Sequence, residues 1–168
     1  MKTPESIESI TRKKMKETEI DKIKIRSISS CVGISHQSLL YYYGNKENLI
    51  VETYRGMLNE IKVKENPTFS NLLCSLFGYW SSKREIVYNF NLSFKKNDRV
   101  KERIFAEFNI WSDFYLMRCS DVESTNVEYF RMLLISLTFH PFISIANGEV
   151  NLKVEDILDF YASLKITS

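Results

Sequence analysis

Residues 36–43 carry the side chains best suited to chemistry. Their sequence is HQSLLYYY, they follow Ser35, and Gly44 comes directly after them. A glutamine side chain can form two hydrogen bonds to a base edge, and serine and tyrosine hydroxyls can contact phosphates. If the run is a helix, its N-terminus also attracts anions. These residue types therefore suit a surface that contacts nucleic acid.

A helical wheel separates this run into two faces. At about 100° per residue, Leu39, Leu40 and Tyr43 gather on the side that is expected to pack on a core. The opposite side and the first turn expose polar groups, which gives the candidate DNA-contacting residues Ser35, His36, Gln37, Ser38, Tyr41 and Tyr42. The alternative is a small polar helical hairpin that binds no ligand, since such hairpins also occur in helical bundles.

Two short helices would hold this face in place. Apolar residues recur at helical spacing from Ile25 to Val32, and Gly33 stands where a helix C-terminus favours a left-handed residue. Ser35 can cap the next helix, and Asn45 can cap the one that follows. The segment therefore has the dimensions of a helix-turn-helix.

Residues 25–50 resemble the DNA-binding head of the TetR family of bacterial and archaeal repressors. The sequence IRSISSCVGISHQSLLYYYGNKENLI fits the family pattern V-R-D-I-A-x-x-A-G-V-S-x-G-T-L-Y-x-Y-F-x-S-K-E-x-L without a gap, and apolar residues extend the match back to residue 7. The most specific matching positions are Gly33, Ser35, Leu39, Tyr42, Lys46, Glu47 and Leu49. The resemblance implies that Gln37, with its two neighbours, contacts bases in the major groove, while Tyr41 and Tyr42 contact phosphates.

Two basic residues are further candidates for phosphate contacts. Lys46 opens the helix after the predicted recognition helix, so that its ammonium and the first amides of that helix would act on one phosphate. Arg26 begins the preceding helix. Either residue could instead be a solvated charge. The four basic residues between Arg12 and Lys16 are expected to be solvated, although some of them could steer DNA.

Three residues depart from the family pattern. Gln37 stands where the family often has glycine, and Glu19 replaces a glycine that usually follows the first helix. Leu40 replaces a tyrosine that commonly contacts phosphate. Because of Leu40, a second hypothesis remains open, in which the chain is a helical homodimeric interaction module that keeps the fold of the head without specific DNA binding.

Charge and composition limit the partners that the chain could bind. The net charge is +2 over 168 residues, but residues 1–50 carry 9 Lys/Arg and 6 Asp/Glu, a local charge of +3. The N-terminal third is therefore the part expected to approach a polyanion. We expect no membrane segment and a cytoplasmic location, because no apolar signal core opens the chain and its most apolar run is too short to cross a bilayer.

No catalytic or metal-binding pattern is found in the sequence. A glycine-rich phosphate loop and a Gly-x-Ser-x-Gly motif are both absent. The two histidines lie more than a hundred residues apart, and Cys31, Cys74 and Cys119 form no Cys-x-x-Cys pair. The cysteines are expected to be small buried side chains. The sequence therefore predicts a non-enzymatic protein without a metal or cofactor.

Helical periodicity continues to the end of the chain and predicts an all-α protein. No segment has the period of two that strands require. We expect a DNA-binding head at residues 1–50 and a ligand-sensing and dimerisation body at residues 51–168. Pro141 is expected to kink or end its helix, and Asn147 with Gly148 to stop one.

The resemblance implies two functions for the body. Its last two helices, around 124–146 and 152–165, would form a four-helix interface in a homodimer, unless their apolar stripes serve only the core of one chain. A small apolar or aromatic effector would lower operator affinity. The candidate ligand-binding residues are Phe77, Trp80, Phe90, Phe94, Phe105, Phe108, Trp111, Phe114, Tyr115 and His140, with Asn89 and Asn109 as further polar anchors. These aromatic residues could equally form only a core.

Overall fold

The computed structural model describes residues 4–94, 98–146 and 153–163. Within these ranges all regular elements are helical, which confirms the all-α prediction. The α-helices are α1 Pro4–Glu17, α2 Ile25–Val32, α3 His36–Tyr43, α4 Lys46–Asn59, α5 Phe69–Ser81, α6 Arg84–Phe94, α7 Asp98–Leu116, α8 Val127–Ala146 and α9 Val154–Ser163. Two short 3₁₀ turns, η1 Ile20–Lys22 and η2 Ser124–Asn126, connect α1 to α2 and lead into α8.

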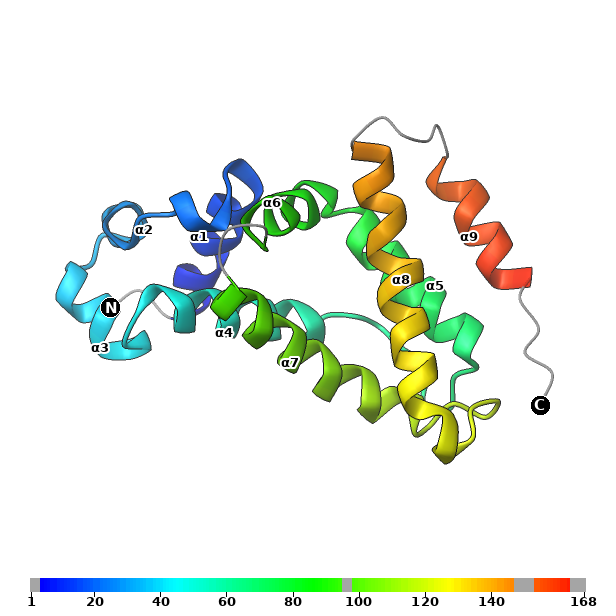
Figure 1. Ribbon diagram of the computed structural model, residues 1–168. Coiled ribbons are helices and arrows are strands. Elements are labelled where there is room, and N and C mark those ends of the chain that lie inside the picture. The colour runs from blue at the N-terminus through cyan, green and yellow to red at the C-terminus, as the bar shows by residue number, and fades with distance from the viewer. Residues whose placement is uncertain (1–3, 95–97, 147–152, 164–168) are drawn as a thin grey trace.

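The helices form an elongated molecule with a small head at one end (Figure 1). Helices α1, α2 and α3 make this end, while α5, α8 and α9 make the opposite end. Between them lie α4, α6 and α7. Helix α1 packs on α2, α4 and α6, α4 packs on α7, and α5 packs on α8 and α9. The middle helices therefore connect the head to the rest of the chain.

A single hydrophobic core runs through both parts of the molecule. It includes Met15 and Leu39 in the head and Met57, Trp80 and Phe108 further along, all of them almost completely buried. The expected boundary at residue 50 falls inside α4, whose buried residues run from Leu49 to Leu58. Because α4 packs on both parts, a movement of this helix would change the packing of the head and of the body.

Helix α8 continues past Pro141 and ends at Ala146, so the proline does not end it. A proline has no N–H and cannot donate to the carbonyl four residues earlier, which here belongs to Leu137. The Tyr161 hydroxyl of α9 donates a hydrogen bond to this Leu137 carbonyl at 2.5 Å. The missing bond in α8 is thus replaced by one from α9. The expected stop at Asn147 and Gly148 lies outside the described residues.

The cysteine prediction is only partly correct. Cys119 is buried and Cys74 is half-buried, but Cys31 is exposed. It lies near the end of α2, to one side of the stripe formed by the buried Ile28, Ser29 and Val32. In the described part of the chain, His, Cys, Asp and Glu residues form no group of three that could hold a metal ion. None of the helices described there combines the length and apolar character needed to span a membrane.

Candidate nucleic-acid interface and effector cavity

The turn between α2 and α3 is fixed by capping at both sides. Gly33 takes a left-handed conformation with φ of 75°, and the amides of Gly33 and Ile34 both donate to the Ser29 carbonyl, at 2.9 and 3.0 Å. The Ser35 hydroxyl then accepts a hydrogen bond from the Ser38 amide at 3.0 Å. This confirms the predicted stop and cap. The orientation of α3 is therefore set by local backbone chemistry.

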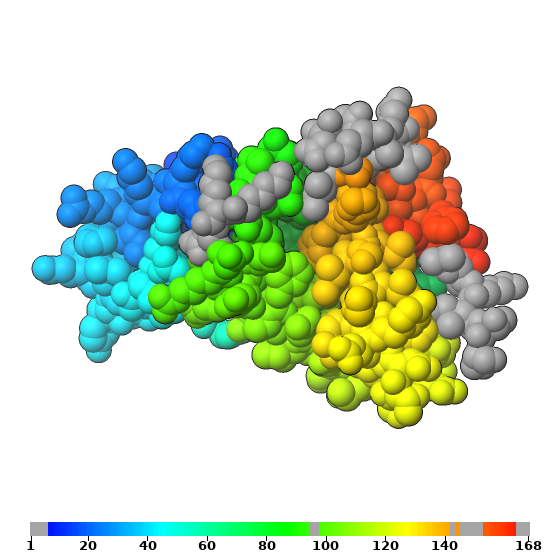
Figure 2. All heavy atoms as spheres, viewed as in Figure 1, coloured from blue at the N-terminus to red at the C-terminus, as the bar shows by residue number. Residues whose placement is uncertain are grey.

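The outer face of α3 carries the predicted polar residues. Leu39 is fully buried, whereas Gln37 is exposed, and the exposed fractions of Tyr41 and Tyr42 are 88% and 51%. The two tyrosine rings meet edge to face, with 5.8 Å between their centroids. Figure 2 shows that the residues of α2 and α3 form the narrower end of the molecule. This face is therefore open to a large partner.

His36 and Ser38 are half-buried and contribute to the first turn of α3. The Ser38 hydroxyl lies 2.8 Å from that of Ser35, so one of these hydroxyls donates a hydrogen bond to the other. The Nδ1 atom of His36 is buried without a hydrogen-bond partner among the described residues. The first turn thus has polar groups that a ligand could satisfy, although they are less accessible than Gln37.

The two predicted basic contacts differ in their surroundings. Arg26 is exposed and forms no ion pair with a described residue. Lys46 is half-buried, and its Nζ donates to the Asp21 carbonyl at 3.0 Å. This bond holds η1 against the start of α4 and uses only one of the three protons of the ammonium. Lys24, which caps α2 and is also exposed, was missed in the sequence although it stands two residues before Arg26.

The basic residues of α1 are occupied by carboxylates instead. Arg12 bonds Glu60, and the other three pair with Glu17 or Glu85 at 2.9–4.0 Å: Lys13, Lys14 and Lys16. The Tyr79 hydroxyl also donates to Glu60 at 2.8 Å. Partial burial acts to raise the pKa of Glu60, but the hydrogen bonds from Arg12 and Tyr79 outweigh it and lower that pKa. These residues join α1 to α4 and α5.

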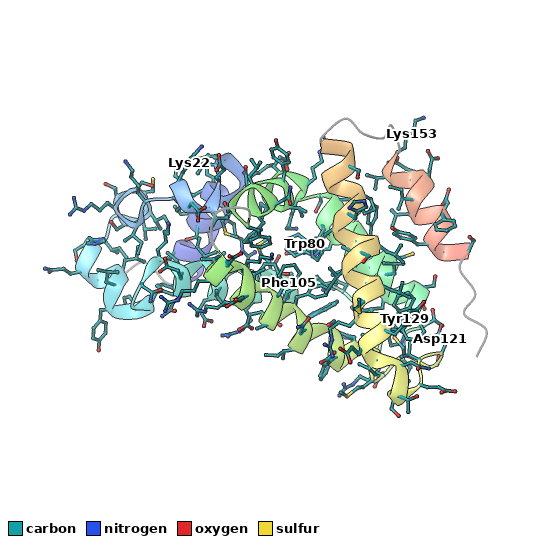
Figure 3. All side chains as sticks on the ribbon, in the orientation of Figure 1. Lys22, Trp80, Phe105, Asp121, Tyr129 and Lys153 are labelled. Carbon is teal, nitrogen blue, oxygen red and sulfur yellow. The ribbon has the colours of Figure 1, made fainter. Side chains whose placement is uncertain are left out.

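A cavity of about 720 Å³ lies among α4, α5, α6, α7 and α8. This volume is in the range of pockets that hold small ligands. Six residues predicted from the sequence line it, namely Trp80, Phe90, Phe94, Phe105, Phe108 and His140. The rest of the lining was missed: Tyr54, Val87, Asn91, Lys101, Ile104, Ile135, Ser136 and Phe139. Figure 3 shows Trp80 and Phe105 close together in the middle of the molecule.

Four predicted aromatic residues lie outside this lining: Phe77, Trp111, Phe114 and Tyr115. Phe77 packs edge to face on Tyr161 of α9, with 5.4 Å between the ring centroids. Trp111 packs on Tyr115 at 4.8 Å further along α7. Phe114, on the same helix, has 51% of its side chain exposed. These rings serve the packing of neighbouring helices or the surface.

The two predicted asparagine anchors also lie elsewhere. Asn89 donates from Nδ2 to the carbonyls of Met15 and Lys16, both at 3.0 Å, so that it caps the end of α1. The Oδ1 atom of Asn109 is buried without a partner in the described chain, but this residue is not part of the cavity lining. Asn91, two residues after Asn89 on α6, takes the place at the cavity.

The inner end of the cavity has two polar groups among aromatic rings. Trp80 is fully buried and its indole N–H has no acceptor among the described residues. Tyr54 stacks on Trp80 at 5.7 Å between ring centroids. Burial raises the pKa of Tyr54 far above its usual range, so its hydroxyl remains protonated. A ligand with a hydrogen-bond acceptor could accept a bond from the indole N–H of Trp80. Without such an acceptor, the buried N–H lowers the stability of the fold.

Hydrogen bonds link the cavity helices to the head on two sides. From α7, Arg103 donates to Asn48 Oδ1 at 2.8 Å, and Asn48 Nδ2 donates to the Tyr43 carbonyl at the end of α3, also at 2.8 Å. From α6, Ser93 Oγ accepts from the Ile20 amide at 2.8 Å. A change in the spacing of α6 and α7 would therefore reach α3 and η1 directly.

Comparison with known proteins bears on the fold of the chain. No protein-family model matches the chain, and no curated protein matches it by sequence. Among solved structures, a TetR transcriptional regulator from Rhodococcus sp. RHA1 superposes with a TM-score of 0.65 at 13% identity, over 93% of this chain and 88% of that chain. The chain therefore has a TetR-like fold, as the resemblance of residues 25–50 predicts.

Proposed function

We propose that this chain, which has a TetR-like fold, is a transcription regulator of that type and acts in the cytoplasm as a repressor. The observation that carries this proposal is the capped helix α3, which presents Gln37, Tyr41 and Tyr42 outward at one end of the molecule. A glutamine is suited to a base edge and the tyrosine hydroxyls to phosphates. Arg26, in the first turn of α2, adds an exposed positive charge that pairs with no described carboxylate.

Dimerisation through α8 and α9 would give the regulator its second DNA-binding head. Both helices expose large apolar side chains: Tyr129 and Met132 on α8 have exposed fractions of 62% and 64%, and Phe160 on α9 has 57%. Side chains of this kind are common at the centre of protein interfaces. Two copies related by a twofold axis would present two α3 helices to successive turns of one duplex face.

An effector in the cavity would lower operator affinity by moving the helices that hold the head. The cavity lies between α6 and α7, and each of these helices is hydrogen-bonded to the head through Ser93 or Arg103. A ligand that separates the two helices would shift α3 relative to its copy in the dimer. Couplings of this kind amount to about 1–3 kcal/mol.

Fluorescence anisotropy with DNA from upstream of the chain's own gene tests the proposal. The protein is titrated at several salt concentrations and in the presence of excess unrelated duplex. We expect saturable binding by two protomers per site that survives the competitor and weakens steeply with salt, because bound phosphates release counterions. Gln37→Ala should reduce this binding, and Lys64→Gln, on an exposed residue between α4 and α5, serves as control.

Two other results of the anisotropy titration would contradict different parts of the proposal. Binding that disappears with competitor would contradict a specific operator in that DNA. If no binding occurs even at low salt while the chain is dimeric, the regulator proposal fails. The helical interaction module without DNA binding would then be the better description.

A further inference from the structure

The chemistry of the cavity lining differs between its two ends. The inner end is formed by the buried rings of Trp80 and Tyr54. Three lining residues are exposed, and they are polar: Lys101 on α7, and Ser136 and His140 on α8. Apolar residues of α6, α7 and α8 fill the walls between the two ends. A ligand that matches this lining has an apolar body and a polar head.

The charge at the opening is positive. No Asp or Glu is found among the described residues that line the cavity. Lys101 forms no ion pair with a described carboxylate, unlike the basic residues of α1, which are all paired. It lies in the first turns of α7, where the helix dipole adds to the positive potential. The opening therefore favours an anionic group over a neutral or cationic one.

The position of Lys101 on α7 connects this charge to the apolar walls. Lys101, Ile104, Phe105 and Phe108 are spaced three, four and seven residues apart and line the same cavity, so they share one face of the helix. The lysine thus stands at the outer end of a row of apolar side chains. Across the opening, Ser136 and His140 lie one turn apart on α8 and add two hydrogen-bonding groups.

We propose that the cavity takes an amphipathic ligand with an apolar body and a carboxylate head, and that Lys101 binds this head at the opening. The inference rests on the effector cavity proposed above and names the chemical class of its ligand. The apolar body lies against Trp80 and Phe108, where it removes apolar surface from water. Ser136 and His140 provide the remaining hydrogen bonds to the head.

A matched pair of probes tests this proposal, namely ω-bromoundecanoate and ω-bromoundecanol at neutral pH. Both have eleven carbons and a terminal bromine, but only the first carries a negative charge. Bromine quenches tryptophan emission on contact, so binding in the cavity is followed through Trp80. The chain has two tryptophans, and Trp111→Phe therefore leaves Trp80 as the single reporter. If that variant does not fold, calorimetry on the chain with both tryptophans gives the same affinities.

The measured quantity is the ratio of the two affinities, carboxylate over alcohol. In Lys101→Gln we expect this ratio to fall about five- to tenfold, since a hydrogen bond to a charged group is lost at an exposed site. The alcohol should bind within about twofold of its original affinity, because the neutral probe has no charge for Lys101 to bind. Lys64→Gln, at an exposed lysine that is not part of the lining, should leave both affinities unchanged.

Two results would overturn the inference in distinguishable ways. If both probes quench Trp80 and the ratio is the same in Lys101→Gln, the cavity binds apolar bodies without a site for the head. The effector cavity then stands and only the ligand class is wrong. If neither probe quenches Trp80 nor releases heat, the cavity does not bind such ligands, and the effector part of the proposed function fails together with this inference.

Discussion

Gln37 and Tyr42 project from the same short helix but are suited to different parts of a duplex. The amide of Gln37 has a donor and an acceptor side by side, the pattern that a base edge in the major groove presents. The Tyr42 hydroxyl can contact only one phosphate oxygen, which is the same for every sequence. In the proposed DNA complex, Gln37 would therefore determine sequence specificity, whereas Tyr42 would add affinity for any sequence.

Substitutions at these positions should show this separation. Gln37→Ala is expected to change the order of preference among operators that differ at single base pairs, by about 1–3 kcal/mol at the contacted pair. Tyr42→Phe is expected to weaken all of them by a similar factor. Anisotropy titrations against a panel of such operators measure both effects. An unchanged order in Gln37→Ala would contradict its role as a base contact.

Lys46 shows why a side chain's role cannot be taken from its sequence position alone. The sequence places it at the start of a helix, where a phosphate contact is plausible. The structure adds a hydrogen bond from its Nζ to the Asp21 carbonyl, from a residue 25 positions earlier. Such a long-range bond leaves no trace in the local pattern, whereas the Ser35 and Asn45 caps lie three residues from their partners and were predictable.

Helix α7, like α6, contacts both the cavity and the head. One of its faces lines the cavity through Ile104 and Phe108, and Arg103 extends to Asn48 at the start of α4. Next to it, Arg55 of α4 forms two hydrogen bonds with Glu107, at 2.7 and 2.6 Å. These contacts fix the register of α4 against α7.

The Arg103–Asn48 bond should give a measurable coupling between these helices. A double-mutant cycle with Arg103→Met and Asn48→Ala is expected to yield a coupling free energy of about 1 kcal/mol in chemical unfolding. Arg103→Met combined with Lys64→Gln serves as the control pair and should be additive. Additivity in the first pair as well would show that the bond does not join the two helices energetically.

Helices α8 and α9 are joined by the bond between Tyr161 and the Leu137 carbonyl. Burial raises the pKa of Tyr161 to about 12, above the value of about 10 in an unfolded chain. The folded chain thus holds this proton more tightly. Its contribution to the free energy of unfolding is constant below about pH 10 and decreases as the pH rises from about 10 to about 12.

Removing the hydroxyl tests this arrangement. Tyr161→Phe is expected to lower the free energy of unfolding by about 1–2 kcal/mol at neutral pH, because the Leu137 carbonyl loses its donor. The decrease between about pH 10 and pH 12 should also become shallower. Adding Pro141→Ala restores an N–H that can serve this carbonyl and should recover part of the loss. Urea unfolding at several pH values measures all three, and a lack of recovery would contradict the explanation.

The cavity shows the limit of what helical periodicity can predict. Phe77 and Trp80 lie three residues apart on α5 and are equally buried. Phe77 meets Tyr161 of α9, whereas Trp80 meets Phe139 of α8 and lines the cavity. Only the packing of α8 and α9 against α5 determines which of the two side chains lines the cavity. The place of Lys101 in the lining could have been predicted from the sequence. It lies four and seven residues before Phe105 and Phe108, and this helical spacing puts the lysine on the same face of α7 as these aromatic residues.

At the scale of the whole molecule, an elongated chain with its head at one end is suited to pair with a second copy of itself through the opposite end. In the proposed DNA complex, a single α3 would contact only a few base pairs, which limits both affinity and specificity. A second copy doubles the contacts and fixes their spacing. The exposed apolar residues of α8 and α9 lie on the part of the molecule away from the head (Figure 1).

The proposed interface predicts different effects for two equally exposed aromatic residues. Phe160→Asp on α9 should weaken the dimer by about thirtyfold or more, as expected for a buried interface aromatic. Phe114→Asp on α7 is the matched control, since 51% of Phe114 and 57% of Phe160 are exposed. Analytical ultracentrifugation measures the dimer dissociation constant. Loss of the dimer in Phe114→Asp alone would place the interface on α7.

Near Pro141, the same turns of helix α8 contact both α9 and the cavity. Four residues before the proline, the Leu137 carbonyl bonds Tyr161 of α9, while the adjacent Ser136 and the nearby His140 line the cavity. In a dimer formed through α8 and α9, helix α8 would thus belong both to the dimer interface and to the wall of the ligand site. By thermodynamic reciprocity, a ligand that alters α8 changes the affinity of the two protomers for each other. The apparent ligand affinity would then depend on protein concentration, so that, under the proposed function, the cellular abundance of the chain would itself set its sensitivity to the effector.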